Sequence, residues 1–179
     1  MVMNILLIRH ADALPLGEGG ILDDESRPLS EQGHAQCAPL ARALTRLGVR
    51  PEVVVSSPLL RARQTASGLL QAWDGTPPEL RIAEEAGPDG RRTKLAKLLR
   101  GLTAETVAVV GHMPYLRQFA GWLIGGKKAQ LDLAKAGAAY LASETHAAKG
   151  GSELCWMLTP EICKAMAGEA LPSPGEPAA

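Results

Sequence analysis

The feature that most constrains the fold is an alternation of short apolar runs with longer stretches of helical periodicity. Runs rich in Val, Ile and Leu occupy residues 4–8, 53–55 and 106–110. Between them, apolar residues recur at the three- and four-residue spacing of amphipathic helices. Such an alternation favours a parallel sheet that is covered by helices on both faces. We therefore predict an α/β fold: a three-layer α/β/α sandwich with a mostly parallel central sheet.

Capping and breaking residues place the helices. Ser30 suits the N-cap of a helix that stops at Gly48, and Pro39 is expected to kink or delay it. The remaining elements follow from periodicity, with helices expected from about residues 58, 93, 114 and 161 and further strands at 80–83, 136–142 and 153–158.

Composition bounds the class of protein. The 179 residues, of which 46% are hydrophobic, suit one domain over residues 1–168, and the Pro-, Gly- and Glu-rich segment 169–179 is predicted to be disordered. Basic and acidic residues balance at 19 each, which gives no overall field for nucleic acid or an anionic membrane. No apolar run reaches membrane-spanning length, so we expect a soluble, cytoplasmic protein. The oligomeric state stays open.

Cysteine and histidine spacing gives no sign of a disulfide framework or a metal site. The odd cysteine count and the lack of a CxxC pair favour reduced, structural thiols at Cys37, Cys155 and Cys163. The histidines show no zinc-site spacing either, and they lie at His10, His34, His112 and His146. We therefore predict no metal and no cofactor.

Three of the expected strands end in polar motifs. Arg9-His10 follows the first, a segment that contains Arg61 follows the second, and His112 follows the strand at 106–110. Because parallel strands end at the same edge of a sheet, these side chains should converge there. Alone, each motif has a structural alternative. For Arg9-His10 it is a surface ion-binding edge or a satisfied structural pair, for Arg61 and Arg63 a solvated helix surface, and for His112 a helix cap. Together they predict a phosphate site of guanidinium and imidazole groups.

The motifs as a set resemble the signature blocks of the histidine phosphatase superfamily. The matching blocks are Arg9-His10, Ser57-Pro58-x-x-Arg61-Ala62-x-Gln64-Thr65 and Gly111-His112-x-Pro114, and the resemblance spans roughly residues 3–158. Short length and the segments at 9–13 and 26–29 most resemble the small bacterial phosphohistidine phosphatases of SixA type. Ala11 departs from the family, which commonly has Gly there, and its methyl group is expected to narrow the pocket or limit the approach of the backbone.

The resemblance implies residue roles. It makes His10 the nucleophile, with phosphohistidine as a covalent intermediate, and Arg9, Arg61 and His112 the phosphate clamp. His10 must be neutral at one nitrogen to attack, whereas His112 works best protonated beside the bound phosphate dianion, so their pKa values should be pushed apart.

The general acid is expected in the acidic cluster after the strand at 80–83. Glu85 is the preferred match there by its distance to the following helix, with Glu84 and Asp89 nearby, and a solvated surface cluster is the alternative. His34 and His146 belong to no matching block and are expected to be structural or solvated. Asp12 and Arg27 are expected at the entrance to the site, with an ion pair or a cap as the alternative.

The implied function is that of a metal-independent phosphatase acting on a phosphohistidine-bearing protein, such as a phosphotransfer domain of a signalling relay. Two alternatives stay open. The first is a phosphomonoesterase acting on a small phosphorylated metabolite, because the motifs specify the phosphate and not its carrier. The second is a phosphate- or phosphoprotein-binding module without catalysis, although a binder needs no nucleophile beside its clamp.

Overall fold

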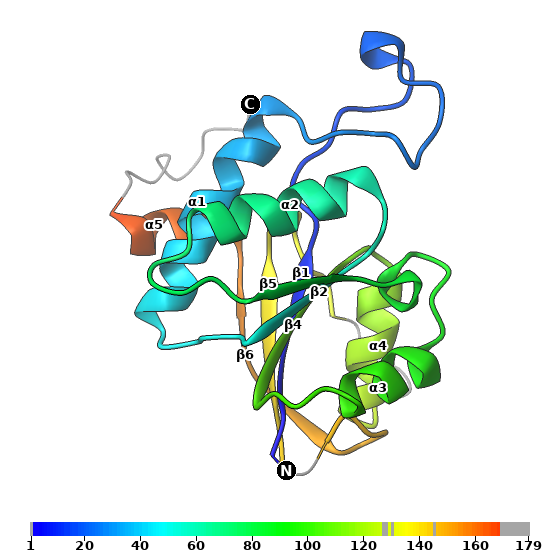
Figure 1. The fold of residues 1–179 in the computed structure, drawn as a ribbon, viewed down its shortest axis with the longest axis vertical. Coiled ribbons are helices and arrows are strands. Elements are labelled where there is room, and N and C mark those ends of the chain that lie inside the picture. Colours follow the sequence, from blue (N-terminus) through cyan, green and yellow to red (C-terminus); the bar gives the residue numbers. More distant parts are fainter. Residues whose placement is uncertain (1, 127–128, 130, 145, 169–179) are drawn as a thin grey trace.

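A computed structural model describes residues 2–126, 129, 131–144 and 146–168. Six strands within these residues form one sheet in the order β3-β2-β4-β1-β5-β6 (Figure 1). The strands are β1 (Asn4–Arg9), β2 (Val53–Ser56), β3 (Glu79–Ile82), β4 (Thr106–Gly111), β5 (Ala138–Ser143) and β6 (Ser152–Leu158). The four from β3 to β1 are parallel, while β5 runs antiparallel to β1 and β6 antiparallel to β5. The predicted mostly parallel sheet is confirmed.

Helices cover both faces of this sheet (Figure 1). One face packs against α1 (Glu31–Arg46), α2 (Leu60–Gln71) and α5 (Pro160–Ala167). The other packs against α3 (Arg92–Arg100) and α4 (Tyr115–Leu123). Two short 3-10 helices, η1 (Glu18–Gly20) and η2 (Glu84–Ala86), lie in the connections. The α/β/α sandwich is therefore the observed architecture.

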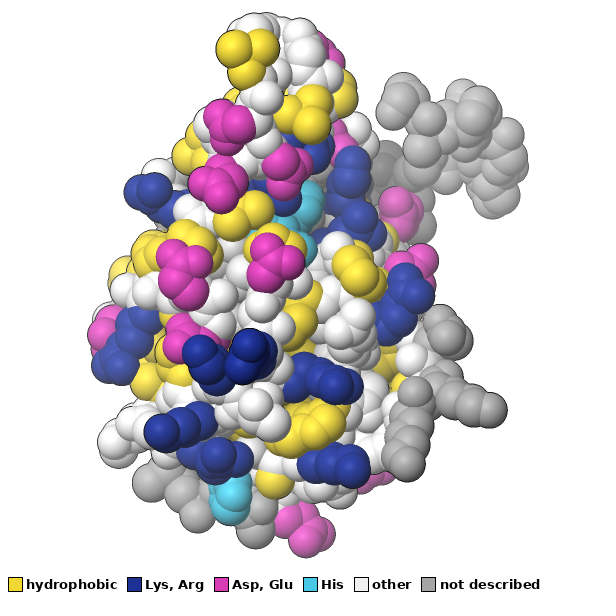
Figure 2. All heavy atoms as spheres, turned by 90° about the vertical axis from the view of Figure 1, so that its right-hand side faces the viewer, with side chains coloured by type: hydrophobic (Ala, Val, Ile, Leu, Met, Phe, Trp, Pro, Cys, Tyr) yellow, Lys and Arg dark blue, Asp and Glu magenta, His cyan; other side chains and the backbone are white. Residues whose placement is uncertain are grey.

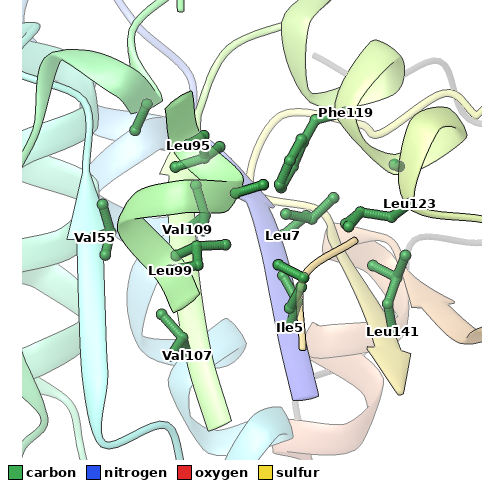
Figure 3. Close-up of a cluster of buried hydrophobic side chains, with 14 of the residues drawn as sticks. Ile5, Leu7, Val55, Leu95, Leu99, Val107, Val109, Phe119, Leu123 and Leu141 are labelled. Carbon is green, nitrogen blue, oxygen red and sulfur yellow. The ribbon is translucent and has the colours of Figure 1, made fainter. Parts of the chain in front are cut away.

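The core explains why the strand sequences are apolar without alternation. Ile5 and Leu7 point toward α3 and α4, whereas Leu6 and Ile8 pack on the opposite face against α1 and α2. Because successive side chains of a strand alternate between faces, a strand that is buried on both sides needs apolar residues throughout. Figure 3 shows the first of these clusters, which includes Val55, Leu95, Leu99, Val107, Val109, Phe119, Leu123 and Leu141.

The predicted start of α1 after Ser30 is confirmed, whereas the predicted delay at Pro39 and the predicted start of β5 are not. The Ser30 hydroxyl accepts a hydrogen bond from the Gly33 amide at 3.0 Å, and α1 starts directly after it and runs past Pro39 without delay. Strand β5 begins two residues later than predicted. The reason is Ala136, whose φ of 56° is left-handed and whose amide donates to the carbonyl oxygens of Arg9 and His10 instead of a strand ladder.

Three further predictions concern the chain as a whole. Residues 169–179, predicted to be disordered, lie outside the described part. Within that part, no helix is long and apolar enough to cross a membrane, and no three His, Cys, Asp or Glu side chains group as metal ligands. The cysteines are free thiols, and burial raises the pKa values of Cys37 and Cys163 to about 11.

Candidate active site

The candidate site is built where three adjacent parallel strands end. His10 follows β1 and His112 follows β4, and the His10 amide donates to the Gly111 carbonyl at 3.0 Å, which extends the ladder beyond the last paired residues. The two imidazole rings therefore lie close together, with their centroids 5.0 Å apart. Figure 2 shows histidine side chains at the surface between acidic side chains on one side and basic side chains on the other.

The His10 side chain is oriented by its neighbour. Its Nδ1 lies 2.7 Å from the carbonyl oxygen of Ala11, which can only accept, so Nδ1 carries the proton and Nε2 keeps its lone pair. Burial, and then the charges of Arg61, Arg9 and Lys135, outweigh that hydrogen bond and lower the pKa of His10 to about 4. His10 is consequently a neutral imidazole near pH 7, with an unprotonated Nε2 for attack on phosphorus.

Arg61 approaches His10 from the first turn of α2. Its Nε lies 3.3 Å from His10 Nε2, and its side chain is almost fully buried. Thr65, one turn later, donates to the Arg61 carbonyl at 2.7 Å and accepts from the Ala11 amide at 3.0 Å. Thr65 thus fixes α2 to the segment that carries His10. This contact gives a physical role to the Arg-x-x-x-Thr spacing of the second motif.

His112 is held by a side chain of the same motif. Its Nε2 lies 2.7 Å from Ser57 Oγ, and its Nδ1 is buried without a hydrogen-bond partner among the described residues. Burial, and then the charges of His10 and Arg61, lower its pKa to about 3. The predicted separation of the two histidine pKa values applies to the site with a phosphate dianion bound, and it stays a prediction. Both are lowered, because burial and the same cations act on both rings, and a phosphate dianion is the charge that would raise them.

Arg9 lies at the end of β1 beside this pair. Its Nη1 donates to the Leu133 carbonyl at 2.8 Å, while its Nε is buried and has no partner in the described part of the chain. The charge of Arg9 acts on both His10 and His112. A buried, unsatisfied N–H on a guanidinium suits a bound anion. Arg9, Arg61, His10 and His112 are thus brought together as the sequence predicted.

Asp24 was not anticipated from the sequence. It lies in the long connection before α1, and its Oδ2 and its carbonyl oxygen accept from Nη2 and Nη1 of Arg61 at 2.9 and 2.6 Å. Its Oδ1 accepts from Arg27 at 2.9 Å. Hydrogen bonds from Arg27 and then from Arg61 lower the pKa of Asp24 despite partial burial. Nothing in the spacing of the acidic run at 23–25 distinguishes this residue, because the contact depends on how the loop folds back onto α2.

The three acidic candidates after β3 are divided between two hollows. Glu84 and Asp89 line one together with Asp24 and Leu59. Glu85, half-buried in η2, lines a different hollow together with side chains of α3. Glu85 therefore does not line the hollow that contains Asp24, the residue in contact with Arg61. The role of Glu85 as the general acid stays a prediction.

The remaining sequence candidates have structural contacts. Asp12 accepts from Ser30 Oγ and from Lys135 Nζ, both at 2.5 Å, so the ion-pair alternative describes it. Arg27 binds the Leu14 carbonyl as well as Asp24. The side chain of Ala11 is fully buried and packs in a small cluster with Leu29, Cys37 and Ala136. His34 and His146 are exposed.

Comparisons with known proteins agree with this fold and site. The model of the histidine phosphatase superfamily (branch 1) matches residues 5–85. An uncharacterised protein of Picosynechococcus sp. is 32% identical over 139 residues, covering 75% of this chain and 82% of that protein. The phosphohistidine phosphatase SixA of Escherichia coli K12 is 27% identical over 161 residues, which cover 88% of this chain and 94% of SixA.

Solved structures extend the match. The protein histidine phosphatase SixA complexed with tungstate superposes with a TM-score of 0.77 at 24% identity, over 88% of this chain and 97% of that one. A putative α-ribazole-5'-P phosphatase from E. coli shares the fold with a TM-score of 0.68 at 19% identity, over 89% and 98% of the two chains. The chain belongs to the histidine phosphatase superfamily. Its similarity to SixA supports a phosphatase.

Proposed function

We propose that this protein is a metal-independent phosphatase that removes phosphate from phosphohistidine in a signalling or phosphotransfer protein. The observation that carries the proposal is the state of His10, a neutral imidazole whose Nδ1–H is bound to a carbonyl and whose Nε2 lies beside Arg61. A positioned, unprotonated nitrogen next to a phosphate-binding guanidinium is the arrangement that nucleophilic phosphoryl transfer needs.

In the first step, His10 Nε2 forms a bond to phosphorus while the bond from phosphorus to the substrate's imidazole nitrogen breaks. Arg9, Arg61 and His112 stabilise the charge on the equatorial oxygens. If the other ring nitrogen of the substrate carries a proton, the substrate leaves as a neutral imidazole and needs no proton from the enzyme. In the second step, water attacks phosphorus, gives up a proton to solvent and releases inorganic phosphate and His10.

The leaving group favours phosphohistidine over an alkyl ester. An alkoxide needs a proton as it leaves, which calls for a carboxyl group that stays protonated near neutral pH. Asp24 is the acidic side chain in contact with Arg61, and its lowered pKa keeps it ionised. With Asp24 ionised, departure of a neutral imidazole or a phenolate is easier than departure of an alkoxide.

The test is hydrolysis, with a chelator present, of a phosphohistidine-bearing phosphotransfer domain, an aryl phosphate and the alkyl ester phosphoserine. We expect turnover of the phosphoprotein and of the aryl ester, and slow turnover of phosphoserine. His10→Ala should lose about a thousandfold or more, whereas the control His34→Ala, on the exposed side of α1, should keep its activity. Fast turnover of small esters alone would instead indicate a small-molecule phosphomonoesterase. No turnover of any substrate would indicate a binding module.

A further inference from the structure

Helix α3 carries an unbalanced positive charge on a chain that is neutral overall. The segment at 91–100 contains five basic residues and no acidic one, while the full chain has 19 of each sign. All five are exposed, and they are Arg91, Arg92, Lys94, Lys97 and Arg100. We call these residues the α3 basic face. Figure 2 shows a group of basic side chains on the same side of the molecule as the histidines.

These cations are poorly compensated within the protein. Arg100 donates to the Ala147 carbonyl, but none of the other four forms an ion pair with another described residue. Arg91 and Arg92 stand at the amino end of α3, where the helix dipole disfavours positive charge. Lys94, Lys97 and Arg100 follow one another at spacings of three, which sets like charges side by side. An external anionic partner would offset both the unfavourable interaction with the helix dipole and the repulsion between like charges.

The α3 basic face also contains a shaped hollow. Arg81, Lys94 and Lys97 surround Leu98 and Leu102 in a depression of about 500 Å³. Arg81 is paired with Glu79, so the unpaired basic charge at the rim comes from the two lysines, and Glu85 adds one carboxylate. An apolar floor with a basic rim suits an amphipathic, acidic segment of a protein.

The hollow is linked to the candidate site through η2. Glu85 of η2 lines it, and the adjacent residue Glu84 lines the next hollow, together with Asp24. Asp24 in turn contacts Arg61. Helix η2 therefore connects the hollow on α3 to the residues around Arg61.

The charges around the site distinguish a protein from a polyanion. Exposed acidic residues line the hollow next to Arg61, and they are Asp24, Glu25, Glu84 and Asp89. A nucleic acid or an anionic membrane is negative throughout and would be repelled there. A folded protein can present an acidic patch to α3 and other groups to the acidic loop.

We infer that the α3 basic face docks an acidic surface segment of the phosphoprotein substrate and positions its phosphohistidine over His10. The inference rests on the proposed function and adds the surface that recognises the carrier of the phosphate. The decisive variant is K94E/K97E, which reverses the two rim charges outside the catalytic machinery. The matched control is R46E/R50E, which reverses two exposed charges, one on the last residue of α1 and one in the connection to β2.

The experiment measures kcat and KM of the wild type and both variants on a phosphohistidine-bearing phosphotransfer domain and on an aryl phosphate, at low and physiological salt. We expect K94E/K97E to raise KM for the phosphoprotein about tenfold at low salt. KM for the aryl phosphate should stay within about twofold of the wild-type value. R46E/R50E should match the wild type on both substrates.

Three outcomes would overturn the inference. The first is an equal effect of K94E/K97E and R46E/R50E on the phosphoprotein, with wild-type turnover intact, which would leave the proposed function standing. The second is no turnover of the phosphoprotein by the wild type while the aryl ester is hydrolysed, which would remove the proposed function itself. The third is binding of single-stranded RNA or phosphatidylserine vesicles by the wild type that K94E/K97E loses, which would assign the face to a polyanion.

Discussion

The buried, neutral state of His10 makes the stability of the protein depend on pH in a calculable way. In the unfolded chain His10 has its ordinary pKa of 6.5, whereas in the folded protein burial and neighbouring cations lower it to about 4. Between these values the unfolded chain binds a proton at this position and the folded protein does not. Folding stability must therefore fall as pH falls from 6.5 to 4, and level off below that.

The size of the effect follows from the same two values. At about 1.36 kcal/mol for each pH unit, the lowering corresponds to about 3 kcal/mol of unfolding free energy lost between pH 7 and pH 4. His112 acts in the same direction, because burial also lowers its pKa. For a domain of ordinary stability this loss is a large fraction of the total.

Urea unfolding of the wild type and of His10→Asn at pH 7, 6, 5 and 4 measures this pH dependence of the unfolding free energy. The stability advantage of the wild type over His10→Asn should shrink by about 3 kcal/mol over this range. His34→Asn, which removes an exposed imidazole from α1, is the control. A wild-type advantage over His10→Asn that is the same at pH 7 and pH 4 would refute the assignment of a buried, neutral His10.

Three further changes test the surroundings of His10. Arg61→Lys should lower kcat/KM for an aryl phosphate by about a hundredfold or more, because an ammonium cannot reproduce the planar fork that binds phosphate; a tenfold loss or less would argue against a clamp role. Asp24→Asn should strengthen inhibition by inorganic phosphate about threefold by releasing Arg61 from a competing carboxylate, and weaker inhibition would contradict that competition. Gly33→Ala should destabilise the protein by about 1–3 kcal/mol in urea unfolding, because a Cβ there would overlap the backbone carbonyl of Asp12. Gln32→Ala, at an exposed position of the same helical turn, is the control for Gly33→Ala, and an equal effect of both would count against the overlap.

The sheet and the converging motifs were predictable because their signals are local. A strand buried on both faces must be apolar throughout, as in β1 and β4, and a polar residue directly after such a strand must lie at the sheet edge. Arg9, His10 and His112 could therefore be placed from the sequence alone. Arg61 could be placed at the same edge because α2 begins soon after β2 ends.

The other contacts of the site depend on loops that have no periodic signal. Asp24 reaches Arg61 only because the connection between β1 and α1 folds back across the first turn of α2. Lys135 reaches Asp12 across 123 residues of sequence. The position of Glu85 shows the same limit, since η2 turns consecutive glutamates toward different hollows and no spacing rule determines which one faces the site.

The central claim is that His10 carries the phosphoryl group during turnover. The most direct measurement is a single-turnover reaction with a phosphohistidine-bearing phosphotransfer domain, quenched in alkali to preserve phosphohistidine and followed by mass spectrometry of the enzyme's peptides. The account predicts a transient phosphoryl group on the peptide that contains His10, formed as fast as the substrate is consumed and missing in His10→Asn. Substrate consumption at the wild-type rate without a phosphoryl group on His10, or with one on another residue, would contradict it.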